Sequence, residues 1–132
     1  MNIKYLVVHC SDTPNNREVT AAEIHDWHKN GNGWDGIGYH VVIKRDGTIE
    51  HGRPEYWPGA HVKGHNSESI GICLIGRDQY TDNQLESLKI ILRARKIKYP
   101  TAATVGHRDL DPAKTCPNFD VAHWLATGEV KA

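Results

Sequence analysis

Two continuous apolar runs constrain the fold of this chain more than any other feature of its sequence. The first extends from Ile3 to His9, where a polar Ser-Asp-Thr-Pro turn follows, and the second extends from Ser69 to Ile75. Apolar runs of about four to eight residues that end at turn residues are typical of buried strands. Both runs are therefore predicted to be buried strands of a sheet.

Three helices are indicated by the residues that cap them. Thr20 is followed three residues later by Glu23, and Thr81 is followed in the same way by Gln84. This spacing is the capping box, in which two side chains satisfy free backbone N–H groups at the start of a helix. Asp120 is a cap for a third helix. The second helix is expected to turn its apolar face inward, with Leu85, Leu88, Ile91 and Leu92.

The remaining pattern predicts an α/β fold. Tyr39 to Arg45 alternates between apolar and polar residues, Asp46-Gly47 is a hairpin turn into Thr48 to His51, and Thr104 to Gly106 is a short strand. The order strand, helix, hairpin, strand, helix, strand, helix indicates a central mixed β-sheet flanked by about three helices. With no repeat or linker in its sequence, the whole 132-residue chain is expected to form one domain without a separate binding module.

Composition excludes several classes of function. Sixteen basic and sixteen acidic side chains cancel, so charge gives no reason to expect direct binding of nucleic acid or of an anionic membrane. The N-terminal segment lacks the features of a signal peptide, and no run is long enough to span a membrane. The three cysteines cannot all pair. We expect a protein that is cytosolic where it is made.

Three residues in separate segments could hold a zinc ion: His9 in LVVHCSD, His107 in GHRDL and Cys116 in KTCPNF. Two imidazoles and a thiolate leave one tetrahedral position free for water, which is the arrangement of catalytic zinc sites. The residual positive charge of such a site lowers the pKa of the water towards neutrality. The spacing alone leaves open a closed structural site, or no metal with Cys116 as a buried thiol.

Four segments together resemble a known family. LVVHCSDT, GYHVVIKRDGTIEHGR, GAHVKGHNSESIGICLIG and GHRDLDPAKTCPNF are similar to successive signatures of zinc-dependent N-acetylmuramoyl-L-alanine amidases. The resemblance is strongest to the amidase-type lysozymes, or endolysins, of T-seven-like bacteriophages, and peptidoglycan recognition proteins are more distant. It extends from about Lys4 to Trp124 and implies the fold, the activity and the site residues of that family.

The resemblance implies a role for five residues. His9, His107 and Cys116 match the ligands of one zinc ion per chain. Tyr39 matches a tyrosine required for hydrolysis, and Lys114 matches a catalytic lysine. A phenol or an ammonium group aimed at the oxyanion of the tetrahedral intermediate would stabilise the transition state. Judged without the resemblance, Tyr39 would be a core aromatic residue and Lys114 a solvated loop charge.

The resemblance is less informative about the substrate and the proton. His61 and Asn66 match a loop beside the metal, where they are expected to bind the peptide part of the substrate. Some relatives carry a glutamate at the position of Cys73 that can act as a general base. Because this chain has a cysteine there, proton transfer is left to Tyr39, to Lys114 or to water.

The expected function is that of a phage or prophage endolysin. It would hydrolyse the amide between the lactyl group of N-acetylmuramic acid and L-alanine of peptidoglycan. We expect a monomer that is made in the host cytoplasm and reaches the wall after release by a holin. An additional role in binding and inhibiting the phage RNA polymerase is the alternative of a different class. An inactive wall-binding protein is disfavoured because such relatives usually lack the cysteine ligand, and Cys116 is present.

Overall fold

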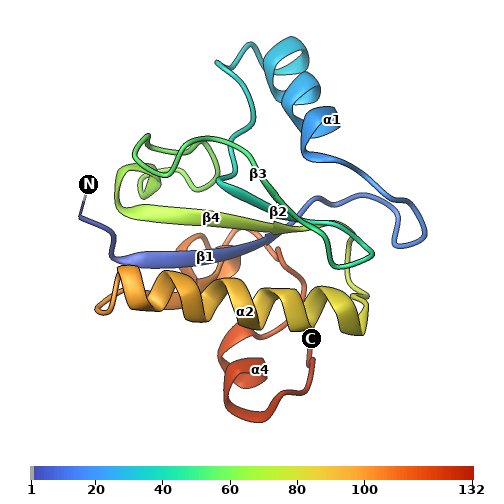
Figure 1. The fold of residues 1–132 in the computed structure, drawn as a ribbon, viewed down its shortest axis with the longest axis vertical. Helices are drawn as coiled ribbons and strands as arrows, with labels where there is room; N and C mark the ends of the chain where they lie inside the picture. The colour runs from blue at the N-terminus through green and yellow to red at the C-terminus, as the bar shows by residue number, and fades with distance from the viewer. Residues whose placement is uncertain (1) are drawn as a thin grey trace.

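A mixed β-sheet with helices on both faces forms the protein, which the computed structural model describes over residues 2–132 (Figure 1). The strand order is β3-β2-β4-β1-β5 in the part of the chain described. β1 is parallel to β4 and β5, β2 is parallel to β4, and β3 is antiparallel to β2. The predicted α/β class is therefore confirmed. The strands are β1 (Tyr5–Cys10), β2 (Val41–Ile43), β3 (Ile49–His51), β4 (Ser69–Leu74) and β5 (Ala103–Gly106).

The helices begin where the capping residues predicted. Thr20 and Thr81 each accept a hydrogen bond from the backbone N–H three residues later, at 3.2 and 3.1 Å, and Asp120 caps the last helix. Two details differ from expectation: the first helix changes to π-helical winding in its last five residues, and a short helix replaces the loop expected at His107. The helices are α1 (Ala21–Asp26) with its π-helical extension (Trp27–Gly31), a 3₁₀ turn (Asn66–Glu68), α2 (Asp82–Lys98), α3 (His107–Leu110) and α4 (Val121–Thr127).

The larger hydrophobic core lies on one face of the sheet, under α2 and α4. Because side chains alternate along a strand, Leu6 and Val8 of β1 point to this face together with Ile70, Ile72 and Leu74 of β4. Leu88 of α2 and Trp124 of α4 cover them and are buried. None of the helices within residues 2–132 combines the length and the apolarity that a bilayer crossing requires.

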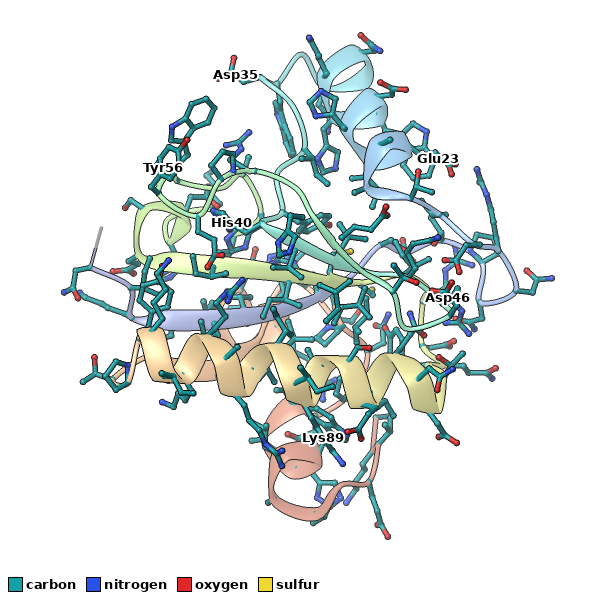
Figure 2. The ribbon with its side chains drawn as sticks, viewed as in Figure 1. Glu23, Asp35, His40, Asp46, Tyr56 and Lys89 are labelled. Atoms are coloured by element: carbon teal, nitrogen blue, oxygen red, sulfur yellow. The ribbon has the colours of Figure 1, made fainter. Side chains whose placement is uncertain are left out.

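The opposite face of the sheet carries buried polar residues, among them His9. Val7 and His9 of β1 lie beside Gly71 and Cys73 of β4 in the parallel register. Helix α1 and the loops that follow it lie on this side, away from α2 (Figure 1). His40 lies in the same layer, above the strands (Figure 2). The sheet therefore has one face covered by the larger hydrophobic core, and histidine side chains lie on its other face.

Candidate metal centre and active site

The three predicted metal ligands come together at the ends of parallel strands. His9 is the last residue but one of β1, and His107 comes directly after the last residue of the neighbouring strand β5. Their ring nitrogens and Sγ of Cys116 all lie within 4.8 Å of one another. Sγ of Cys116 is 3.9 Å from Nδ1 of His9. A nitrogen and a sulfur bound to the same tetrahedral zinc ion lie about 3.6 Å apart, which is close to this distance. This set of donors fits a zinc ion.

The loop that carries Cys116 is tied to both neighbouring elements. The backbone N–H of Cys10 donates to Sγ of Cys116 at 3.1 Å, and the N–H of Arg108 donates to the Cys116 carbonyl at 2.8 Å. The peptide bond between Cys116 and Pro117 is cis. A hydrogen bond with Cys116 lowers the pKa of the Cys10 thiol to about 7, whereas the same hydrogen bond and burial raise the pKa of the Cys116 thiol. A thiolate is the form in which cysteine binds metal, so Cys116 would lose its proton as a metal binds.

Both imidazoles are held in the neutral form that ligation needs. Burial lowers the pKa of His9, and the neighbouring His61 and His107 lower it further. Burial also lowers the pKa of His107, where Asp111 acts in the opposite direction and Lys114 adds to the lowering. A neutral imidazole keeps a lone pair for a metal.

Tyr39 lies against the centre, and its ring centroid is 5.2 Å from that of His9. Burial raises the pKa of Tyr39 well above its usual value, and the nearby thiols raise it further, so the residue stays a neutral phenol that can donate a hydrogen bond. Lys114 is exposed, in the loop that leads to Cys116. Cys73 is buried beside His9, and burial raises the pKa of its thiol, so it remains protonated.

His61 and Asn66 lie beside the centre but are engaged within the protein. Nδ1 of His61 is 2.8 Å from Nε2 of His9, and Nε2 of His61 is 3.2 Å from Oγ of Ser69. Oδ1 of Asn66 accepts the backbone N–H groups of His61 and Val62, each at 2.9 Å. Asn66 therefore fixes the loop that presents His61. Binding of substrate by these two residues stays a prediction.

Neither the place of His40 nor the contact between His9 and His61 was predicted from the sequence. His40 is buried, accepts the N–H of Gly71 at Nδ1 (3.0 Å), and lies 2.9 Å from the Trp57 carbonyl through Nε2. Fifty-two positions separate His9 from His61, so their spacing carries no signal. The only indication was that His9 and His61 both lie in segments that resemble the amidase family.

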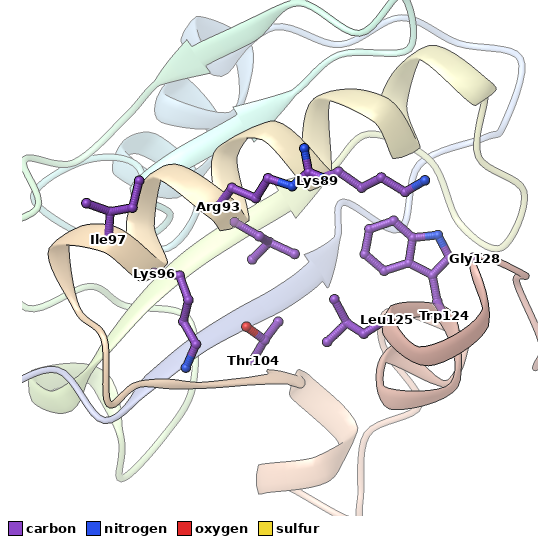
Figure 3. A pocket seen from close by; sticks show the side chains of 9 residues that line it. Lys89, Arg93, Lys96, Ile97, Thr104, Trp124, Leu125 and Gly128 are labelled. Carbon is purple, nitrogen blue, oxygen red and sulfur yellow. The ribbon is translucent and has the colours of Figure 1, made fainter.

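The face opposite the candidate centre carries an open groove of about 670 Å³ between α2 and α4 (Figure 3). Lys89, Arg93 and Lys96 of α2 line it together with Trp124 and Leu125 of α4. The sheet separates this groove from the histidines, so it is not part of the candidate centre.

A mixed α/β sheet with two imidazoles and a thiol at its strand ends defines the class of candidate metal-dependent hydrolases. Comparison with known proteins is more specific, because the model of the N-acetylmuramoyl-L-alanine amidase family matches residues 1–119. The endolysin of Enterobacteria phage K11 is 43% identical over 131 residues, 93% of this chain and 85% of that protein. The endolysin of Escherichia phage T7 is 41% identical over 133 residues, 95% of this chain and 87% of that protein.

A solved structure agrees with the sequence relatives. The N-acetylmuramoyl-L-alanine amidase LysC from Clostridium intestinale URNW has a TM-score of 0.80 and 35% identity, covering 88% of this chain and 76% of that chain. The chain therefore belongs to the N-acetylmuramoyl-L-alanine amidase family. It is an amidase of the phage endolysin type, as the sequence motifs predicted.

Proposed function

We propose that the amidase activity depends on one zinc ion held by His9, His107 and Cys116. The observation that carries this proposal is the group of three ligand atoms within 4.8 Å of one another, two of them on imidazoles whose pKa values are lowered. Zinc prefers nitrogen and sulfur ligands, and three protein ligands leave a position open. When bound, zinc would supply Lewis acidity and lower the pKa of a water molecule.

The chain's own residues would stabilise the reaction at the amide between N-acetylmuramic acid and L-alanine of peptidoglycan. As the carbonyl carbon becomes tetrahedral, its oxygen gains negative charge. The neutral phenol of Tyr39 would donate a hydrogen bond to that oxygen, and the Lys114 ammonium group would add its positive charge. Because Cys73 stays a protonated thiol, the amine leaves with a proton that comes from Tyr39, Lys114 or water.

We propose that the loop of His61 and Asn66 borders the muramyl peptide. Oδ1 of Asn66 is occupied by two backbone N–H groups, which leaves its Nδ2 group to donate to a peptide carbonyl of the substrate. His61 is buried, and its two ring nitrogens contact His9 and Ser69. Its contribution to substrate binding is therefore expected to be smaller than that of Asn66.

The decisive experiment follows the turbidity of permeabilised Gram-negative cells treated with the protein. Lysis should stop when a chelator has removed all metal and should return when zinc is added back. Lysis that persists in metal-free protein would refute zinc dependence. The digest should contain new free amino groups of L-alanine, and new reducing sugar ends in their place would refute cleavage at the amide.

The cellular context is proposed from the family. A protein of the endolysin type would reach the wall after holin-mediated release, act as a monomer and need no separate wall-binding domain. Binding of a phage RNA polymerase would use the protein surface and not the metal. A Tyr39→Phe variant that no longer lyses walls should then still inhibit transcription by that polymerase, and unchanged transcription at saturating protein would exclude this second role.

A further inference from the structure

Two side chains behind the candidate metal centre, Ser69 and His61, form a chain of hydrogen bonds that ends on His9. Oγ of Ser69 lies 2.7 Å from the His65 carbonyl and 3.2 Å from Nε2 of His61. Nδ1 of His61 lies 2.8 Å from Nε2 of His9. Each contact is within hydrogen-bonding distance, and the chain runs from the start of β4 to the end of β1.

Only one arrangement of protons satisfies all three contacts. A carbonyl cannot donate, so the Ser69 hydroxyl must donate to the carbonyl of His65. Oγ of Ser69 then accepts a hydrogen bond from the Nε2–H group of His61. A neutral imidazole carries one N–H, so Nδ1 of His61 is an acceptor and must receive the N–H of His9.

The consequence for His9 is a fixed tautomer. With its proton on Nε2, the lone pair of His9 is on Nδ1, and Nδ1 is the atom that lies 3.9 Å from Sγ of Cys116. The chain of hydrogen bonds therefore directs the metal-binding lone pair towards the other ligands. Ligating histidines are commonly oriented in this way by a carboxylate or a carbonyl behind them, whereas here the acceptor is a second imidazole.

The backbone around His61 is shaped to hold its ring in this position. Gly71 of β4 lies under the ring, and a Cβ there would meet the ring at 2.6 Å. Gly59 lies beside it, and a Cβ there would meet Cδ2 of His61 at 2.5 Å. Asn66 fixes the backbone N–H of His61 itself. The ring is therefore confined on two sides and anchored at its base.

We propose that His61 is a positioning residue, which together with Ser69 fixes the tautomer and orientation of His9 for metal binding. This inference rests on the proposed zinc site. It assigns to His61 a role through His9 rather than contact with the peptide. His61 and Ser69 supply no negative charge, so their contribution is the direction of the lone pair.

Two measurements test the inference, and one of them needs no metal. In the metal-free protein, ¹⁵N spectra of the histidine side chains should show His9 with its proton on Nε2. A His61→Leu variant removes the acceptor, and both tautomers of His9 should then be populated. In competition with a chromophoric chelator, the zinc affinity of His61→Leu should be about 10- to 100-fold weaker than that of the wild type, the range for lost partners behind a ligand.

Matched variants separate positioning from general damage. His61→Asn restores an acceptor near the Nδ1 position and should recover most of the zinc affinity. His40→Asn changes another buried imidazole, whose ring centroid is 5.7 Å from that of His61 and whose own contacts are to Gly71 and Trp57. Its zinc affinity should stay within about threefold of the wild type, since its hydrogen bonds do not reach a ligand. Ser69→Ala retains the His61 ring, so it tests the chain if His61→Leu does not fold, and it should populate both tautomers of His61.

The outcomes distinguish the two proposals. Failure of the wild type to bind zinc would refute the zinc site, while the tautomer of His9 in metal-free protein would still decide the role of His61. Tight zinc binding by both the wild type and His61→Leu, with an unchanged His9 tautomer, would overturn the positioning role alone.

Discussion

The backbone amide of Cys10 donates a hydrogen bond of 3.1 Å to Sγ of Cys116, although 106 positions separate the two residues. It joins the end of β1 to the loop after α3, and thereby sets the sulfur next to His9, which precedes Cys10 in the chain. This N–H donor favours the thiolate of Cys116, although the Cys10 thiol and burial raise the pKa of Cys116 overall. The contact thus places the candidate ligand next to His9.

Replacing Cys116 by serine should abolish tight zinc binding. A hydroxyl is a far weaker zinc ligand than a thiolate, and the loss should exceed the roughly 100-fold that a missing partner behind a ligand can cause. Metal content after dialysis and lysis of permeabilised cells should fall together. Cys73→Ala is the matched control, because that buried thiol lies beside His9 in the sheet but does not belong to the group of three. Equal losses of zinc in both variants would argue against Cys116 as the ligand.

Replacing Tyr39 by phenylalanine should lower kcat by about 10²- to 10³-fold, the effect of removing one donor to an oxyanion. The ring that packs 5.2 Å from His9 remains, so zinc content and thermal stability should stay near wild-type values. The activity is best followed as release of peptide from purified peptidoglycan.

Lys114→Met removes a charge from an exposed side chain. If Lys114 stabilises the oxyanion, kcat should fall while the free energy of unfolding stays within about 0.5 kcal/mol. If Lys114→Met kept the wild-type kcat, Lys114 would be a solvated loop residue with no role in stabilising the oxyanion. Lys63→Met, at another exposed lysine in the loop before Asn66, provides the control for a general loss of positive charge.

The core under α2 gives a prediction about stability. Leu88 is fully buried against the sheet, whereas Ile97 on the same helix is 84% exposed. Leu88→Ala should lower the free energy of unfolding by about 2–5 kcal/mol, and Ile97→Ala should change it by less than about 0.5 kcal/mol. Denaturant titration of the two variants measures both values. Similar losses would mean that α2 does not pack on the sheet through Leu88.

The sequence predicted those parts of the structure that depend on local physics. The capping boxes at Thr20 and Thr81 and the two apolar strands have direct signals in a few adjacent residues. The contact between His9 and His61 has no such signal, because it depends on the register that places Gly71 beside Val7 and leaves room for a ring. The short helix α3 was missed for a related reason. The carboxylate of Asp109 holds this single turn by accepting a hydrogen bond of 2.7 Å from the N–H of Gly106. A helix of four residues is too short to show a periodic pattern of apolar residues.

Buried imidazoles should make the metal-free protein less stable in acid. Burial lowers the pKa of His40 from its usual 6.5, and burial lowers that of His61 to about 3. Above pH 6.5 these groups are neutral in both the folded and the unfolded chain, so they add no pH dependence. As the pH falls through 6.5, the unfolded chain binds protons that the folded protein cannot accept, and the free energy of unfolding decreases.

His40→Asn should measurably reduce this decrease in the free energy of unfolding at acidic pH. One histidine contributes a slope of up to about 1.4 kcal/mol per pH unit between the unfolded and folded pKa values. The variant should be less stable than the wild type at pH 8, where the contacts of His40 to Gly71 and Trp57 are intact, and the difference should narrow towards pH 5. Denaturant titrations in the presence of a chelator measure it without interference from metal release. Parallel curves for the two proteins from pH 8 to pH 5 would show that His40 can be protonated within the fold, which its bond from the Gly71 amide opposes.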